Sequence, residues 1–111
     1  QTLNLLREDS HDPKTFNKVV KKLDGRLVDL LFIDGDHTYE GVKQDWEMYK
    51  PLVRPGGLVV FHDVAEHYEG DVQVDRLWQE IKQEYRTEEY IDTTSGDYIN
   101  KHWGGIGVVY V

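Results

Sequence analysis

Polar side chains directly follow two apolar runs of the sequence. Asp34 comes after the run Val28–Ile33, and His62 and Asp63 come after Leu58–Phe61. Two carboxylates that lie close together repel each other unless a proton or a cation lies between them. Carboxylate oxygens favour Mg²⁺, Ca²⁺ or Mn²⁺, and an added imidazole shifts the preference toward Mn²⁺, Fe²⁺ or Zn²⁺. Asp34, His62 and Asp63 are therefore candidate ligands of a divalent cation.

A histidine close to Asp34 in the sequence is a candidate general base. His37 stands three residues after Asp34, and an unperturbed imidazole has a pKa near neutrality. Asp36, between them, is either a further polar group of the site or a cap of the following helix. The aspartates have a structural alternative, because an Asp after a strand often only forms a turn.

The elements that must position these residues alternate between strand and helix. Continuous apolar runs such as Val28–Ile33 and Leu58–Phe61 are typical of strands covered on both faces. A helix from about Tyr39 to Leu52 is predicted between them, and Pro55-Gly56-Gly57 ends that unit. A helical crossover makes the two strands parallel neighbours, whose carboxyl ends meet at the edge where open α/β sheets bind ligands.

The remaining elements are consistent with a single α/β domain. Alternation predicts a first strand, which a polar loop with Ser10 and His11 follows. The next helix has Asp12 as its N-cap and Pro13 at its first position. The elements predicted around the central unit are a strand over Thr2–Leu6, a helix from Pro13 to Leu23, a helix from Val74 to Tyr85, a weak strand near Tyr90–Thr93 and a closing strand over Ile106–Val111.

Composition narrows the class of partner. The formal net charge is −8 and no basic cluster exceeds Lys21-Lys22, which argues against binding nucleic acid. No apolar run approaches the roughly 18 residues of a membrane span. The absence of cysteine fits a reducing compartment, and we expect a cytoplasmic protein. The chain begins Gln-Thr-Leu without an initiator Met, so we expect it to be a piece of a longer protein.

Two segments resemble a known family. They are VDLLFIDGDHTYEGVKQD, residues 28–45, and PGGLVVFHD, residues 55–63. Together they resemble class I S-adenosylmethionine-dependent methyltransferases of the family related to cephalosporin-hydroxylase-type and macrolide-sugar O-methyltransferases. The helix over 74–81 and the closing GGIGVVY, residues 104–110, are similar to that family too, so the resemblance covers nearly the whole chain.

The resemblance implies a fold and an activity. The fold is α/β, a partial Rossmann-like methyltransferase sheet that is mostly parallel, with an antiparallel C-terminal strand and helices on its faces. In the family strand order 3-2-1-4-5-7-6, residues 1–111 would supply strands 3 to 7 and lack strands 1 and 2. The implied reaction is S-adenosylmethionine-dependent O-methyl transfer to a hydroxylated small molecule, a sugar or secondary metabolite, assisted by Mg²⁺ or another divalent cation.

The resemblance also assigns roles to single residues. His37 matches the base that deprotonates the acceptor hydroxyl, and Ser10, His11 and Asp34 fall at cofactor-binding positions. Asp34, His62 and Asp63 match metal ligands, although His62 stands where some metal-dependent relatives have an acidic residue, which leaves the metal's identity open.

The family's glycine-rich cofactor turn and ribose-binding acid have no counterpart in this chain, so we expect residues 1–111 alone to bind S-adenosylmethionine poorly and to be inactive. Either Thr2–Leu6 collapses onto Val28–Ile33, or another chain, for example in a homo-oligomer, fills the gap. The alternatives are a non-catalytic α/β binding module and a metal-dependent phosphohydrolase, whose acidic loops the IDGDH segment superficially resembles.

Overall fold

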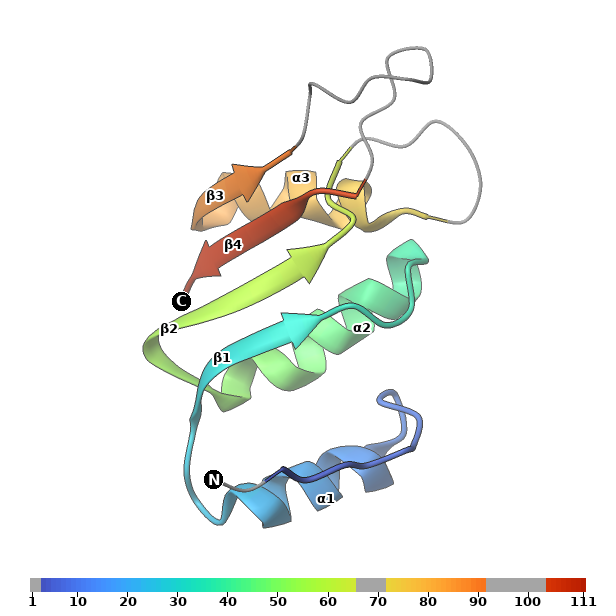
Figure 1. The fold of residues 1–111 in the computed structure, drawn as a ribbon, viewed down its shortest axis with the longest axis vertical. Helices are drawn as coiled ribbons and strands as arrows, with labels where there is room; N and C mark the ends of the chain where they lie inside the picture. Colours follow the sequence, from blue (N-terminus) through green and yellow to red (C-terminus); the bar gives the residue numbers. More distant parts are fainter. Residues whose placement is uncertain (1–2, 66–71, 92–103) are drawn as a thin grey trace.

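The computed structural model describes residues 3–65, 72–91 and 104–111 and forms one open α/β sheet with helices (Figure 1). The strand order is β1-β2-β4-β3; β1 and β2 are parallel, and the other two pairs are antiparallel. This order is the 4-5-7-6 part of the expected sheet, although the described strands form a mixed sheet, with only one parallel pair. The elements are α1 Pro13–Leu23, β1 Val28–Ile33, α2 Tyr39–Tyr49 with a 3₁₀ turn Lys50–Leu52, β2 Val53–His62, α3 Val74–Glu84, β3 Arg86–Tyr90 and β4 Ile106–Tyr110.

The predicted helix starts are confirmed, and their caps explain them. Asp12 accepts a hydrogen bond from the Lys14 backbone N–H at 2.9 Å, with Pro13 in the first turn. At α2 the N-cap is Thr38, whose hydroxyl accepts from the Gly41 N–H at 3.2 Å. Asp36 supports this cap by accepting from the backbone N–H and the hydroxyl of Thr38. The aspartate therefore orders the turn between β1 and α2.

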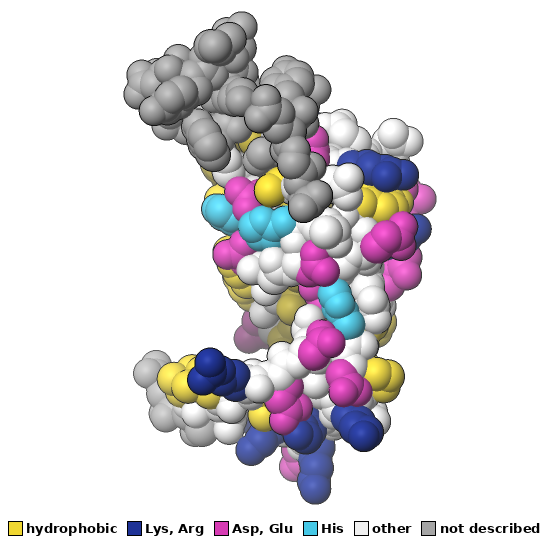
Figure 2. All heavy atoms as spheres, turned by 90° about the vertical axis from the view of Figure 1, so that its right-hand side faces the viewer, with side chains coloured by type: hydrophobic (Ala, Val, Ile, Leu, Met, Phe, Trp, Pro, Cys, Tyr) yellow, Lys and Arg dark blue, Asp and Glu magenta, His cyan; other side chains and the backbone are white. Residues whose placement is uncertain are grey.

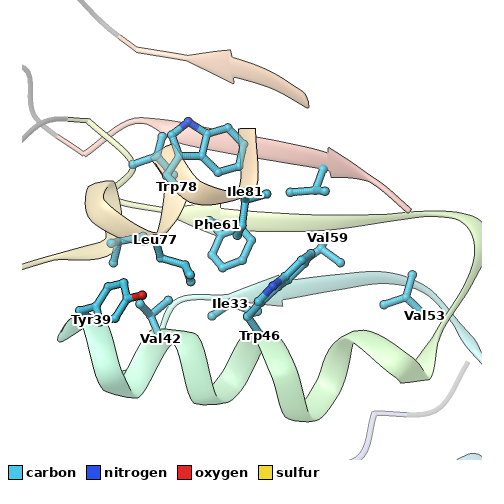
Figure 3. Packing of buried hydrophobic residues seen from close by; sticks show 13 residues of the cluster. Ile33, Tyr39, Val42, Trp46, Val53, Val59, Phe61, Leu77, Trp78 and Ile81 are labelled. Atoms are coloured by element: carbon cyan, nitrogen blue, oxygen red, sulfur yellow. The ribbon is translucent and has the colours of Figure 1, made fainter. Parts of the chain in front are cut away.

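The core lies between the sheet and the helices α2 and α3, as Figure 3 shows. Trp46 of α2 and Trp78 of α3 both contact Phe61 of β2, with ring centroids 5.5 and 6.1 Å from it. Trp78 packs directly over Gly107 of β4, where an added Cβ would lie 2.6 Å from the indole ring. The predicted inward positions of α3 are confirmed, because Val74, Leu77, Trp78 and Ile81 are all buried.

The opposite face of β1 differs from the prediction. Leu30 and Phe32 are 52% and 51% exposed, so the expectation that this strand is covered on both faces is wrong for this chain. The apolar run forms a strand because neighbouring β2 pairs with it, while no described helix covers its second face (Figure 1).

The predicted first strand is also wrong over the part that is described. Residues 3–6 pair with no described strand and are not part of the sheet, and Leu3 and Leu5 are more than 80% exposed. Alternating side chains favour a strand only where a neighbour supplies hydrogen bonds, and this segment instead runs beside α1 (Figure 1). The alternative in which it collapses onto β1 is therefore excluded for residues 3–6; residue 2 lies outside the described part.

Two further strand boundaries differ from the predicted ones. β2 starts at Val53, before the Pro55-Gly56-Gly57 segment, which forms an irregularity in its pairing with β1. Gly57 allows this close approach, because a Cβ there would lie 2.9 Å from the carbonyl oxygen of Asp29. β3 covers Arg86–Tyr90 and ends where the predicted strand was to begin; residues 92–103 lie outside the described part. Within the described ranges, no helix has the length and apolar character to cross a bilayer.

Candidate functional site

The ends of β1 and β2 bring the predicted polar residues together. Ile33 pairs with Phe61 in the parallel register, so Asp34 and His62 follow side by side at one edge of the sheet. His62 Nδ1 lies 3.3 Å from Asp34 Oδ1 and 3.0 Å from Asp63 Oδ2. The expected convergence of these three side chains is therefore confirmed as geometry.

Asp63 adopts a backbone conformation that the neighbouring strand stabilises. Its φ is 64°, in the left-handed region that Asp tolerates better than most residues. Its N–H donates to the carbonyl oxygen of Gly105 at 3.0 Å, and the Ala65 N–H donates to that of Gly104 at 2.9 Å. The glycine pair before β4 thus holds Asp63 so that its carboxylate reaches the end of β1.

His37 lies between the two carboxylates. Its Nε2 is 3.1 Å from Asp34 Oδ1, and its Nδ1 is 3.0 Å from Asp63 Oδ2. One ligand atom from each of Asp34, His37, His62 and Asp63 can be chosen so that all four lie within 4.8 Å of one another. We refer to these four residues as the rim cluster.

Asp36 is not part of the rim cluster. Its carboxylate accepts two hydrogen bonds from Thr38, at 2.8 Å from the backbone N–H and 2.7 Å from the hydroxyl. These bonds, the backbone one foremost, hold the pKa of Asp36 below its ordinary 3.8. Asp36 is therefore neither a member of the rim cluster nor the N-cap itself, because it acts by supporting Thr38, which is the N-cap of α2.

Gln73 fixes the backbone on both sides of Thr38. Its N–H donates to the His37 carbonyl oxygen at 2.6 Å, and its side-chain oxygen accepts from the Tyr39 N–H at 3.0 Å. Sequence reasoning missed this residue, because Gln73 lies at the start of α3 and nothing in the sequence places it beside the loop after β1. It ties the loop that carries His37 to a second helix.

The rim cluster fits a divalent cation. Ligands of one such ion lie about 2.0–2.6 Å from it, so any two of them are at most roughly 5 Å apart, and the four chosen atoms meet this limit. His62 Nδ1 is buried and has no hydrogen bond from any described residue, although it lies within ion-pair distance of both carboxylates. A buried nitrogen without a hydrogen bond, facing two carboxylates, suits coordination to a metal ion.

Ser10 and His11 lie at a second group of contacts, centred on Asp45. The Ser10 hydroxyl donates to Asp45 Oδ1 at 2.7 Å, and His11 Nε2 lies 3.2 Å from the same oxygen. Asp45 is only 5% exposed. It closes the first resembling segment, yet sequence reasoning gave it no role; a charged residue on the apolar side of a helix was the available signal.

A hollow of about 490 Å³ connects the two groups of residues. Ser10, Asp45 and Tyr49 line it from one side and residues 31–35, which include Asp34, from the other. Seen from the side, the surface has a deep notch between the N-terminal part and the main body, and histidines lie among acidic side chains on this face (Figure 2). Asp34 thus belongs to the rim cluster and also lines the hollow, whereas His11 contacts Asp45 beside it.

This chain is similar in sequence to known proteins. A family model described as a methyltransferase domain matches residues 3–64. The protein y4gI of Sinorhizobium fredii (strain NBRC 101917 / NGR234) is 40% identical over 70 residues, which are 61% of this chain and 7% of y4gI.

Two solved structures have a similar fold. One is the O-methyltransferase from Bacillus cereus in complex with SAH, with a TM-score of 0.51 and 20% identity over 86% of this chain. The other is the MycE methyltransferase from the mycinamycin biosynthetic pathway in complex with Mg and SAH, with a TM-score of 0.52 and 17% identity over 95% of this chain. The chain spans 47% and 32% of these two structures. The Rossmann-like methyltransferase fold that the resemblance implied is thereby confirmed.

Proposed function

This chain belongs to the family of methyltransferase domains, and we propose that its protein transfers a methyl group from S-adenosylmethionine to a hydroxyl oxygen of a small molecule. One observation carries the proposal: Asp34 borders a hollow large enough for part of a cofactor and also contacts His37, a base candidate. A methyl donor in the hollow and an acceptor at the rim cluster would then meet at the end of β1. The SAH in the B. cereus and MycE complexes supports this choice of methyl donor.

We propose Ser10, His11 and Asp34 as the residues that bind the cofactor. Ser10 and Asp34 line the hollow from opposite sides, and His11 holds the turn next to Ser10. When bound, S-adenosylmethionine supplies an electrophilic methyl group on a sulfonium. The carboxylate of Asp34 beside this hollow favours a positively charged ligand.

His37 is the proposed general base. An imidazole takes a proton near neutral pH, and both ring nitrogens of His37 lie within 3.1 Å of a carboxylate oxygen. The carboxylate that bonds one nitrogen fixes the orientation of the ring. His37 removes the hydroxyl proton, the oxygen bonds to the methyl carbon, and the carbon–sulfur bond breaks to leave a neutral thioether.

Asp34, His62 and Asp63 are the proposed metal ligands. A bound divalent cation would attract the acceptor oxygen and lower the pKa of its hydroxyl group. Two carboxylates and an imidazole suit Mn²⁺, Fe²⁺ or Zn²⁺ as well as Mg²⁺. The Mg in the MycE complex supports a cation in a protein of similar fold.

The proposal is tested by methyl transfer in the full-length protein. Radiolabelled S-adenosylmethionine is incubated with a panel of hydroxylated sugars and phenols, and transfer to at least one acceptor is expected. Asp34→Asn and His37→Gln should reduce this transfer, whereas Gln79→Ala on the exposed side of α3 should not. Transfer that both site variants leave unchanged would contradict the catalytic roles and favour a sheet edge used for binding alone.

A second part of the proposal concerns residues 1–111 by themselves. The glycine-rich turn that binds the cofactor in the resembling family has no counterpart in these residues, so we expect very weak binding of S-adenosylmethionine and no activity. Isothermal titration of the 111-residue chain tests this expectation. Micromolar affinity would contradict it.

A further inference from the structure

Asp45 is a buried carboxylate that the proposed reaction does not use. It lies on α2 between Gln44 and the core residue Trp46, and it is 5% exposed. Removing a charged group from water is unfavourable unless hydrogen bonds or opposite charges compensate for it. A carboxylate at such a position therefore needs partners, and these partners indicate its role.

Its described partners lie in the Ser10-His11 turn. Asp45 Oδ1 accepts from the Ser10 hydroxyl at 2.7 Å and lies 3.2 Å from His11 Nε2. The same Nε2 is 3.0 Å from the carbonyl oxygen of Gly41, which can only accept. His11 Nε2 therefore carries the hydrogen and shares it between the carbonyl of Gly41 and the carboxylate of Asp45.

Three residues on one side of α2, in successive turns of the helix, contact the Ser10-His11 turn. Gly41 contacts the His11 ring, Asp45 contacts both residues of the turn, and the Tyr49 hydroxyl donates to the Ser10 carbonyl oxygen at 2.8 Å. These helix positions are four residues apart and so lie on one face. Residues 3–9 before the turn include exposed leucines, so α2, rather than packing of that segment, fixes the turn.

We propose that Asp45 is a positioning residue, which holds Ser10 and His11 in the conformation that receives the adenosine end of S-adenosylmethionine. The inference rests on the proposed function, which assigns these two residues to the cofactor. Asp45 and Ser10 line the hollow together with Asp34, whereas Asp45 is not one of the four residues of the rim cluster. Losing Asp45 should therefore weaken cofactor binding far more than the chemical step.

The test compares Asp45→Ala and Asp45→Asn in the full-length protein, with Val42→Ala as a control for lost stability in the same helix. Titration with SAH should show an affinity at least tenfold weaker for Asp45→Ala, because the turn loses its hydrogen bonds to a charged group. KM for S-adenosylmethionine should rise while kcat changes little. Asp45→Asn should recover part of the affinity, since its amide oxygen still accepts from Ser10, and Val42→Ala should keep it.

Amide hydrogen exchange over residues 9–12 separates the two proposals. Faster exchange in Asp45→Ala, without ligand, is expected if Asp45 orders the turn. Unchanged exchange, an unchanged affinity, an equal loss of affinity in Val42→Ala, or a fall in kcat at constant KM would each overturn the positioning role. Faster exchange in a protein whose wild type binds no SAH would instead contradict the proposed function and leave Asp45 as the residue that orders this turn.

Discussion

His37 Nδ1 lies 3.0 Å from Asp63 Oδ2, so the loop after β1 contacts the residue that follows β2. The other ring nitrogen is 3.1 Å from Asp34 Oδ1. Each nitrogen of the ring therefore faces a carboxylate oxygen, and the two contacts fix the orientation of the ring. The same ring is also within reach as a fourth metal ligand, and the two roles predict different results.

If His37 is the base, its replacement should affect rate and leave cation binding nearly intact. We expect His37→Gln to lower kcat by roughly 10²–10⁴-fold, the usual contribution of a general base, while the affinity for Mn²⁺ changes only slightly. Steady-state kinetics and a Mn²⁺ titration of the same preparation provide the two measurements. A large loss of Mn²⁺ affinity would identify His37 as a ligand.

Removing a proposed metal ligand should, in contrast to His37→Gln, weaken the binding of the cation. Asp63→Asn is expected to weaken Mn²⁺ binding by roughly tenfold or more, since even outer-shell partners of metal ligands often contribute 10–100-fold. Asp36→Asn is the matched control, because Asp36 bonds Thr38 and stands outside the rim cluster. Isothermal titration with MnCl₂ provides the measurement; equal affinities for the two variants would argue against a metal site here.

The two hydrogen bonds of Gln73 to the loop after β1 should contribute both to the stability of the protein and to the rate of methyl transfer. Gln73→Ala removes the acceptor of the Tyr39 N–H and should lower the free energy of unfolding by about 1 kcal/mol. The loop that carries His37 would also lose one of its two anchors, so kcat should fall. Urea unfolding and methyl-transfer kinetics measure the two effects, with the exposed Gln79→Ala as the control. A variant with normal kcat would show that the remaining backbone bond is sufficient.

Asp36 predicts an acid-dependent loss of stability. Its folded pKa is held below the ordinary 3.8, mainly by the Thr38 N–H, so its contribution is fully present above that value. The contribution is lost as the pH falls through the lowered folded pKa. The free energy of unfolding, measured between about pH 6 and pH 2, should therefore drop less for Asp36→Asn than for the wild type in the acid range. Parallel curves would contradict this role.

Packing at Gly107 should tolerate no side chain. A Cβ at this position would lie 2.6 Å from the Trp78 ring, which is 1% exposed and enclosed by the core. Gly107→Ala is expected to lower the free energy of unfolding by about 1–3 kcal/mol, the usual effect of overpacking. Gly35→Ala serves as the control, because its added Cβ would come no closer than 3.6 Å to Asp45. Similar denaturation midpoints for the two variants would contradict the prediction.

Local sequence patterns predicted most elements because their signals are local. Three elements formed where a local signal predicted them: the helix α1 at its Asp12 cap, the strand β1 at the apolar run Val28–Ile33, and the helix α3 at its apolar spacing. Thr2–Leu6 failed as a strand over its described part, since alternation alone supplies no hydrogen-bonding neighbour. β3 was placed a few residues too late, because its Arg-Thr-Glu-Glu-Tyr sequence lacks apolar alternation and depends on pairing with β4.

The sequence by itself determined that Asp34, His62 and Asp63 would share one edge, because a helical crossover makes consecutive strands parallel and aligns their carboxyl ends. It also placed His37 beside Asp34 through simple proximity in the chain. Only the tertiary structure decided that both His37 nitrogens reach a carboxylate, that Gln73 anchors its loop and that Asp45 holds the Ser10-His11 turn. These contacts join residues far apart in the sequence, and their geometry depends on how the helices pack against the sheet.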